Sequence, residues 1–155
     1  MRAYYDITEK LRDWLVGNEL INVVTIGDIS EVDLNKQGIF PLAHVIVNAA
    51  SLDERVITFD ISILLIDVVD TAVVSTKDVP EAFKGDNNLQ DVYNSMLAVG
   101  NELSQQLMRG DLFSDYFQVV DAIDAEPFQD RFANALAGWS VNFSIEVPNN
   151  DTGVC

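Results

Sequence analysis

The chain has 155 residues, of which 48% are hydrophobic, and its 25 acidic and 9 basic residues give a formal net charge of −16 at pH 7. This length and apolar content predict one folded domain with a substantial core and exclude a disordered chain. The negative charge repels nucleic acid phosphates and anionic lipid headgroups, which argues against ordinary DNA or RNA binding but permits a surface past which DNA slides without sticking.

The N-terminal part of the chain predicts a helix, a strand and a loop. Apolar residues recur at helical spacing over residues 3–16 with charged residues between them, as in an amphipathic helix. Gly17 is a suitable C-terminal stop for this helix. Residues 21–26 are short and β-branched, which indicates a strand. Residues 28–40 are polar and predict a loop.

Residues 42–49 and 56–69 predict an antiparallel hairpin with its turn near residues 51–54. The opposite face of the second arm begins polar but becomes apolar at Leu64 and Ile66. Another part of the chain or another subunit must cover these two side chains, and we name them as candidates for a subunit interface. The other face of the second arm is apolar along its length and carries Phe59, Ile61, Ile63 and Leu65.

The C-terminal half begins with a mixed connector over residues 71–86. A helix capped by Asn87 or Asn88 is then predicted to run to about Met108. Residues 116–123 alternate as a strand does. The predicted helix that ends near Met108 has an apolar stripe, which consists of Leu89, Val92, Met96, Val99, Leu103 and Leu107.

Residues 139–147 alternate without a break, which predicts a strand with one buried and one wet face. One or two helical turns are predicted before it, over residues 127–137. The resulting fold class is α+β: a mostly antiparallel one-sided sheet with two amphipathic helices packed on one face. We expect a single domain over residues 1–148 and a flexible polar tail over residues 149–155. The side chains expected in the core are Trp139, Phe143, Phe59, Ile63, Trp14 and Leu103.

Catalytic devices are not evident in this sequence. His44 is the only histidine and lies in the middle of a predicted strand, where we expect a structural or interface side chain. Cys155 is the only cysteine and belongs to the tail, so no internal disulfide is expected. Neither residue belongs to a nucleophile motif, and no glycine-rich phosphate loop is present. We therefore predict no enzyme, no catalytic residue and no cofactor.

Acidic residues form local pairs, of which Asp67 with Asp70 and Asp121 with Asp124 are examples. Two carboxylates can serve a hydrolase, and several can bind a hard metal ion. The nearest approach to a calcium loop, which starts at Asp28, lacks the central glycine of that motif. We interpret these residues as solvated loop carboxylates and predict no metal site.

Transmembrane and secretory segments are not predicted either. The apolar run 61–66 has the length of a strand, well short of the ~18 residues that span a bilayer. The first residues have no long apolar stretch and no small-residue cleavage site, as a signal peptide would. We expect a soluble protein made in a cytoplasm, with no membrane partner.

The order of elements and several segments resemble the tail-terminator and neck-ring proteins of tailed bacteriophages. The likeness covers most of the chain but is one of order and pattern. The segments that carry it are the leading helix Tyr4–Val16, then Val23-Val24-Thr25-Ile26-Gly27-Asp28, the hairpin from Phe40-Pro41-Leu42 to Asp67 with Thr58-Phe59-Asp60-Ile61-Ser62-Ile63, and the ending Gly138-Trp139-Ser140-Val141-Asn142-Phe143-Ser144-Ile145.

The resemblance implies a structural protein of the virion, assembled in the host cytoplasm. Copies would form a homo-oligomeric ring at the head-tail junction or the tail end, next to portal, neck or tail proteins. An acidic lumen would let DNA pass without specific binding. Apolar contacts around Leu64 and Ile66 would join neighbouring subunits in a closed head-to-tail ring. The connector 71–86 departs from the pattern and is a candidate docking arm.

Two other classes remain open at this point. The first is an acidic DNA-mimic inhibitor of a host nuclease, whose carboxylates should be spaced along one surface as phosphates are. The second is a small enzyme of unknown type, which would need a pocket that holds His44 beside a carboxylate.

Overall fold

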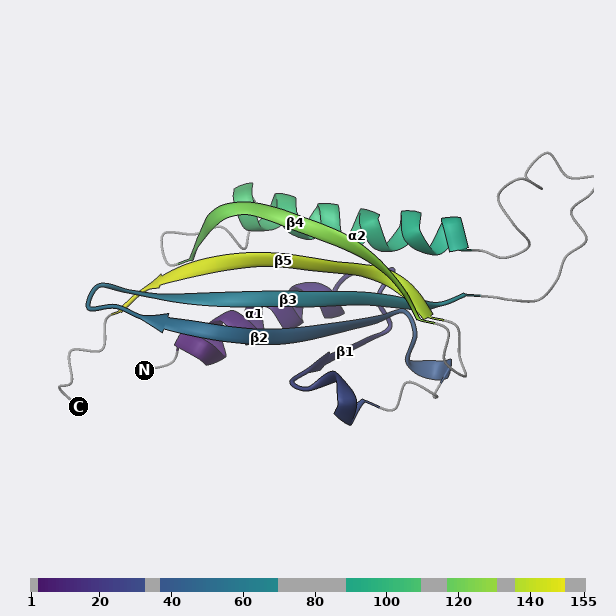
Figure 1. Ribbon diagram of the computed structural model, residues 1–155, viewed down its shortest axis with the longest axis horizontal. Helices are drawn as coiled ribbons and strands as arrows, with labels where there is room; N and C mark the ends of the chain where they lie inside the picture. Colours follow the sequence, from purple (N-terminus) through teal and green to yellow (C-terminus); the bar gives the residue numbers. More distant parts are fainter. Residues whose placement is uncertain (1–2, 33–36, 70–88, 110–116, 131–135, 150–155) are drawn as a thin grey trace, which may run out of the picture.

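Two α-helices and a five-stranded sheet are the main elements of the described part of the chain (Figure 1). The computed structural model describes residues 3–32, 37–69, 89–109, 117–130 and 136–149. The connector 71–86 and Cys155 lie outside these residues. The elements in chain order are α1 (Ala3–Val16), β1 (Val23–Ile26), the short 3-10 helices η1 (Ile29–Glu31) and η2 (Gln37–Ile39), β2 (Leu42–Leu52), β3 (Val56–Val68), α2 (Leu89–Arg109), β4 (Gln118–Asp130) and β5 (Leu136–Pro148).

The strands lie in the order β1-β2-β3-β5-β4, and only the β1–β2 pair is parallel. The predicted hairpin is confirmed, because β2 pairs with β3 in antiparallel register. The last strand is also in the predicted sheet, since β5 lies against β3 with Phe143 opposite Ile61 and Val141 opposite Ile63. The predicted α+β class with a mostly antiparallel sheet is therefore confirmed.

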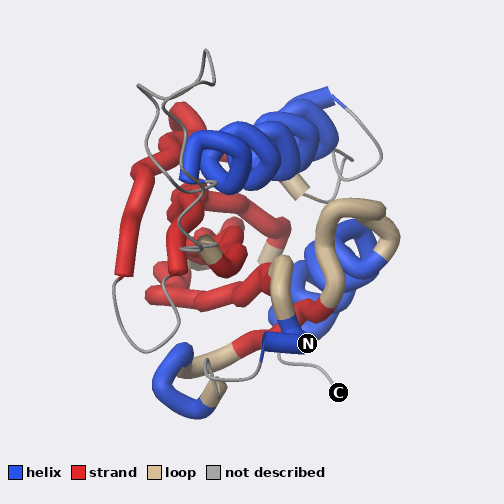
Figure 2. The backbone as a smooth tube through the Cα atoms, turned by 90° about the vertical axis from the view of Figure 1, so that its right-hand side faces the viewer, coloured by secondary structure: helices blue, strands red, loops and turns tan. Residues whose placement is uncertain are grey.

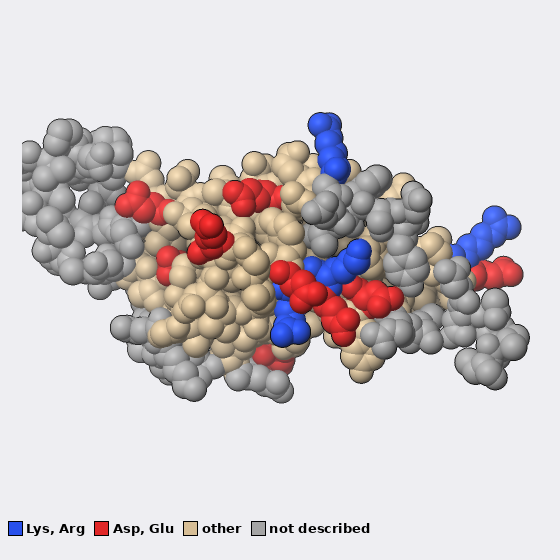
Figure 3. Space-filling model, turned by 180° about the vertical axis from the view of Figure 1, so that it is seen from behind, with Lys and Arg blue, Asp and Glu red and all other residues tan. Residues whose placement is uncertain are grey.

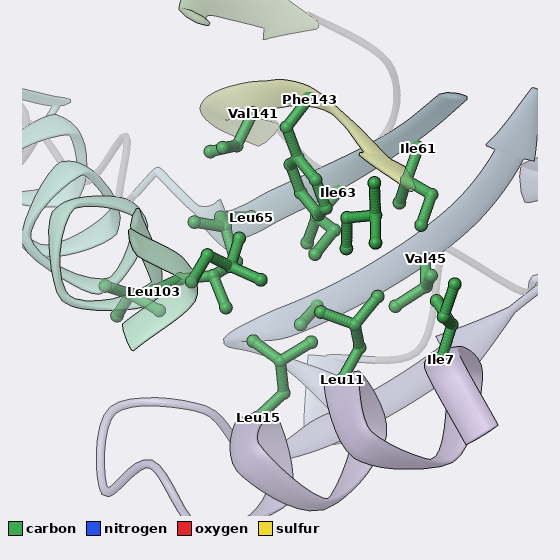
Figure 4. Packing of buried hydrophobic residues seen from close by; sticks show 14 of the residues in the cluster. Ile7, Leu11, Leu15, Val45, Ile61, Ile63, Leu65, Leu103, Val141 and Phe143 are labelled. Atoms are coloured by element: carbon green, nitrogen blue, oxygen red, sulfur yellow. The ribbon is translucent and has the colours of Figure 1, made fainter. Parts of the chain in front are cut away.

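Both helices cover the same face of the sheet, as predicted (Figure 2). In α1 the buried side chains Ile7, Leu11 and Leu15 recur every four residues, which places them on one side of the helix (Figure 4). Leu103 of α2 packs into the same cluster. From the sheet, the cluster takes the alternating residues of β3 and β5, namely Ile57, Phe59, Ile61, Ile63, Leu65, Val141, Phe143, Ile145 and Val147.

The two tryptophans differ from the expectation of full burial. Trp14 and Trp139 pack against the core but are only partly buried. The Trp139 indole N–H donates to the backbone carbonyl of Tyr93, 2.9 Å away, and the two rings meet edge to face. Indole is too large to fill a small core completely, and its N–H needs an acceptor when it is desolvated. Trp139 therefore joins β5 to α2 at the margin of the core.

The prediction of helical turns over residues 127–137 is wrong for residues 127–130 and 136–137, and residues 131–135 lie outside the described part of the chain. Residues up to Asp130 belong to β4, and β5 already begins at Leu136. Pro127 lies opposite Trp139, so this proline sits on the outermost strand, where its missing N–H costs no ladder hydrogen bond. The predicted strand 116–123 is correspondingly too short. An irregularity between Val120 and Asp124 interrupts the alternation that would have revealed its full length.

A second, smaller apolar cluster covers one end of the opposite sheet face. Its cover is the segment between β1 and β2, which contributes partly buried Ile29, Val32 and Ile39. Figure 2 shows helical turns on the side of the sheet away from α1 and α2. The rest of this side carries the exposed residues Asp60, Asp124 and Glu126, and we call it the open face. The buried members of the cluster are Phe40, Leu42, Ile66 and Leu136.

Asp67 lies near the end of β3 and is partly buried, and its carboxylate accepts a hydrogen bond from the Val68 N–H at 2.8 Å. Burial raises the pKa of Asp67 above its usual value, and that hydrogen bond opposes the rise only partly. A raised folded-state pKa means that the folded protein binds the proton more tightly, so the charged form costs stability above that pKa.

We expect Asp67→Asn to raise the melting temperature at pH 7 by on the order of 2 °C. The gain should vanish below the usual carboxyl pKa of about 3.9, where Asp67 is protonated in both states. Thermal melts by circular dichroism at pH 7 and pH 3 measure this. Asp124→Asn, which removes an exposed charge, is the control for general relief of the negative charge. An equal gain from both variants at pH 7 would contradict a specific cost at Asp67.

Candidate functional surface: the open face of the sheet

His44 is completely buried beneath the segment that follows β1. Its Nε2 lies 2.8 Å from the Gly27 carbonyl oxygen and its Nδ1 lies 2.6 Å from the Thr25 hydroxyl. A carbonyl can only accept, so Nε2 donates to Gly27, and Nδ1 is left to pair with the hydroxyl. Both ring nitrogens are thus hydrogen-bonded, and the two bonds fix the chain around Gly27, where φ is +110°. In this geometry His44 positions the backbone.

Polar side chains cross the open face in a hydrogen-bonded row over three strands. Asn48 of β2 donates to the Ser62 hydroxyl at 2.8 Å, and Ser62 donates to the Asn142 side-chain carbonyl at 2.6 Å. A parallel contact joins Ser144 of β5 to the Asp60 carboxylate of β3 at 2.6 Å. Side chains that pair in this way lose rotamer freedom, so the row presents a fixed polar surface.

Carboxylates gather around this row on the same face. Asp60 lies opposite Ser144, Asp124 opposite Asn142, and Glu126 opposite Ser140. Residues directly opposite one another in paired strands point to the same side of a sheet, so these carboxylates share the open face with the polar row. Glu146, two residues after Ser144 in β5, lies on that side as well.

The described strands contribute no positive charge to this surface. None of the five described strands contains a lysine or an arginine, and their charged residues are all Asp or Glu. The helix side differs, because Lys10 and Arg12 lie among the acidic residues of α1. Basic and acidic side chains lie next to one another near the centre of that face (Figure 3). The described part of the chain therefore has one face of mixed charge and one face of a single sign.

Leu64 and Ile66, the candidates for a subunit interface, lie on the same side of the sheet as the open face, at the end that the segment between β1 and β2 covers. Ile66 is only 3% exposed and belongs to the small cluster with Leu42 and Phe40. Leu64 is partly buried against the same cluster. The segment between β1 and β2 of the same chain covers them, as the sequence pattern allowed. The cover by the chain itself is nearly complete for Ile66 and partial for Leu64.

Of the two acidic pairs that the sequence suggested, only Asp121 with Asp124 lies within the described residues. Asp28 caps η1, where its carboxylate accepts from the Ser30 N–H at 2.9 Å, and this hydrogen bond lowers the pKa of Asp28. Asp121 adopts a φ of 65° within the β4 irregularity, whereas Asp124 lies on the open face. Asp70 lies outside the described residues. Among the described residues, no group of three or more His, Cys, Asp or Glu side chains is placed to hold a metal ion.

Sequence reasoning missed half of the acidic surface. Asp60 and Glu146 were assigned to wet strand faces, but Asp124 and Glu126 fell between the predicted strand, which ended at residue 123, and the predicted helical turns, which began at residue 127. Their signal was the alternation of Asp124, Glu126 and Phe128 with Ile123 and Ala125, which continues the strand past its irregularity.

Comparison of the chain with models of known protein families and with curated protein sequences finds no match in either. Neither of the two helices in the described part of the chain is long and apolar enough to cross a membrane.

Proposed function

We propose that this chain is a structural ring protein of a tailed-bacteriophage virion, at the head-tail junction or the tail end, and that the open face lines its DNA channel. The observation that carries the proposal is the single sign of charge on that face, where Asp60, Asp124, Glu126 and Glu146 surround a row of serine and asparagine side chains. The order of elements, which resembles such ring proteins, supplies the biological setting.

The physical role of the open face is to let DNA pass. Duplex DNA carries one phosphate charge per ~1.7 Å of its axis, and proteins bind it chiefly by neutralising those phosphates with Lys and Arg. A face with carboxylates and without described cations offers the phosphates no partner. The hydroxyl and amide groups in the row already bond to one another, which leaves fewer donors for phosphate oxygens.

Assembly must overcome repulsion between subunits that each carry a formal charge of −16. With a Debye length of ~10 Å at 0.1 M salt, much of this repulsion acts between surfaces in contact. We propose that the isolated chain is monomeric at low salt and closes into a head-to-tail ring at high salt or on its neighbour in the virion. A role for Leu64 and Ile66 in this contact would require the segment that covers them to move.

An acidic DNA-mimic inhibitor is the second candidate. The gathering of Asp60, Asp124 and Glu126 on one face favours it, because such an inhibitor presents its carboxylates along one surface. The two candidates differ in oligomeric state. An inhibitor would act as a monomer or tight heterocomplex, whereas a channel requires a ring.

Native mass spectrometry and negative-stain imaging at low and high salt test the ring directly. We expect a closed ring with a central opening at high salt. A chain that stays monomeric at every salt concentration, also when mixed with its neighbours in the virion, would contradict the proposal. Inhibition of a nuclease by that monomer would favour the DNA mimic.

The charge of the channel can be tested on the assembled ring. Asp124→Lys with Glu126→Lys should make the ring retain linear duplex DNA in a gel-shift assay, with retention that falls steeply as salt rises. The matched control, Asp13→Lys with Asp91→Lys, changes the charge equally on the helices α1 and α2. If the helix variant retains DNA and the sheet variant does not, the open face lies outside the channel.

A further inference from the structure

A groove lies between the C-terminal end of α1 and the C-terminal half of α2, the two helices that cover the sheet face opposite the open face. We call it the helix groove. Its volume is about 880 Å³, and its walls include Asp13, Trp14, Glu19 and Leu20 on one side and Asn101 and Glu102 on the other. Trp14 is partly exposed and Leu20 is 44% exposed, so the groove offers apolar contact area as well as charge.

The shape of the helix groove is fixed by hydrogen bonds of Asn18. The Asn18 side-chain carbonyl accepts from the Leu20 N–H at 2.9 Å, and its amide donates to the Glu102 carboxylate at 3.0 Å. The first contact shapes the turn after α1, and the second ties that turn to α2. The groove is therefore formed before any partner arrives, which lowers the entropic cost of binding.

The electrostatics of the helix groove are unfavourable in the free protein. Asp13 lies in the last turn of α1, which carries no basic residue, and Glu19 follows closely. The C-terminus of a helix has a partial negative charge, so carboxylates destabilise it and cations stabilise it. No lysine or arginine of the described residues lines the groove.

In a neighbouring hollow, a cation of the chain itself lies among the carboxylates. It shares Asp13 with the helix groove and also contains Asp6 and Glu9, but there Lys10 lies among the carboxylates. The Lys10 ammonium sits 5.2 Å from the centre of the Phe117 ring, so this cation also makes an aromatic contact. The helix groove has the carboxylates and the aromatic ring without the cation.

We propose that the helix groove binds a segment of a partner protein that carries Lys or Arg together with an apolar residue. The cation would lie between Asp13, Glu19 and Glu102, and the apolar residue would pack on Trp14 and Leu20. A second copy of the chain fits this groove poorly, because with 25 acidic and 9 basic residues it offers mostly like charge to these carboxylates. DNA has the wrong sign, and the carboxylates do not form a metal-binding group among the described residues. The inference holds whether or not the chain forms a ring.

The binding test uses a synthetic 14-residue peptide with Lys and Leu at helical spacing, and a second peptide with Glu in place of Lys. The chain has two tryptophans, so Trp139→Phe leaves Trp14 as the fluorescent reporter inside the groove. We expect the Lys peptide to shift the Trp14 emission to shorter wavelength and the Glu peptide to leave it unchanged.

Two triple variants with the same change in net charge locate the binding site. The groove variant is Asp13→Asn, Glu19→Gln and Glu102→Gln, which keeps an acceptor for Asn18. The sheet variant is Asp60→Asn, Asp124→Asn and Glu126→Gln. We expect the groove variant to bind the Lys peptide at least about tenfold more weakly. The sheet variant should change affinity by about twofold or less, because salt screens distant charges.

A stability measurement distinguishes a binding site from a merely structural cluster. Because the groove carboxylates repel one another and the end of α1, the groove variant should melt about 2–4 °C above the wild type in the absence of peptide. Equal loss of binding in both triple variants would show non-specific charge attraction and overturn the proposal. An unchanged Trp14 emission, or a groove variant less stable than the wild type, would overturn it as well.

Discussion

Gly138→Ala is expected to destabilise the protein strongly. Gly138 lies in β5 directly opposite Ile66 of β3. A Cβ atom at this position would stand 1.7 Å from the Leu65 carbonyl oxygen and 2.8 Å from its carbonyl carbon. Both are backbone atoms, so no side-chain rotation relieves the clash, and β3 would have to move. Overpacking of this kind costs about 3 kcal/mol or more.

Urea denaturation followed by circular dichroism measures this cost. Gly38→Ala is the matched control, because a Cβ there meets no atom within 4 Å. We expect the control to change the free energy of unfolding by no more than about 0.5 kcal/mol. A Gly138→Ala protein with the wild-type unfolding midpoint would show that β3 and β5 do not approach each other as closely as described.

Period and spacing were sufficient to predict most of the elements. The four-residue steps of Ile7, Leu11 and Leu15 predicted α1, and the uninterrupted alternation from Trp139 to Val147 predicted β5 and its buried face. These signals survive because each follows directly from the geometry of one element. The order of strands depends instead on contacts between distant segments, and the parallel placement of β1 beside β2 had no local signal.

The prediction failed where β4 departs from regular geometry. Two features of this strand imitate a loop or helix: the positive φ at Asp121 and the proline at position 127. Irregularities and prolines are tolerated on edge strands, where they also hinder unwanted pairing with other chains. This error affected the candidate surface most, because Asp124 and Glu126 lie in the part of β4 that was not predicted to be a strand.

The apolar drift at Leu64 and Ile66 shows a different limit of sequence reasoning. The alternation correctly indicated that something covers these residues, but it could not distinguish a neighbour from the chain itself. The cover comes from the segment that His44 holds in place through Gly27 and Thr25. A buried histidine that bonds to a backbone carbonyl seventeen residues away leaves no local pattern in the sequence, so cover by a neighbouring subunit and cover by the chain itself could not be distinguished from the sequence.

Phe143→Ala is expected to lower the free energy of unfolding by roughly 3–5 kcal/mol, the usual cost of removing a core aromatic ring. The Phe143 side chain is 5% exposed and lies in the cluster beneath both helices, opposite Ile61. Urea or thermal denaturation gives the magnitude. Leu52→Ala removes a large apolar side chain that is 78% exposed, and it should cost well under 1 kcal/mol.

This variant also tests the surface on which the proposed function depends. The register that places Phe143 in the core places Asn142 and Ser144 on the open face, and their cross-strand partners Asp124 and Asp60 follow them there. Because side chains alternate, a slip of one residue would move the whole set to the opposite side. An unchanged melting curve for Phe143→Ala would therefore show that the faces of β5 are assigned the wrong way round. The carboxylates of the proposed channel would then face the helices. The expected loss of stability would agree with the placement of these carboxylates on the open face.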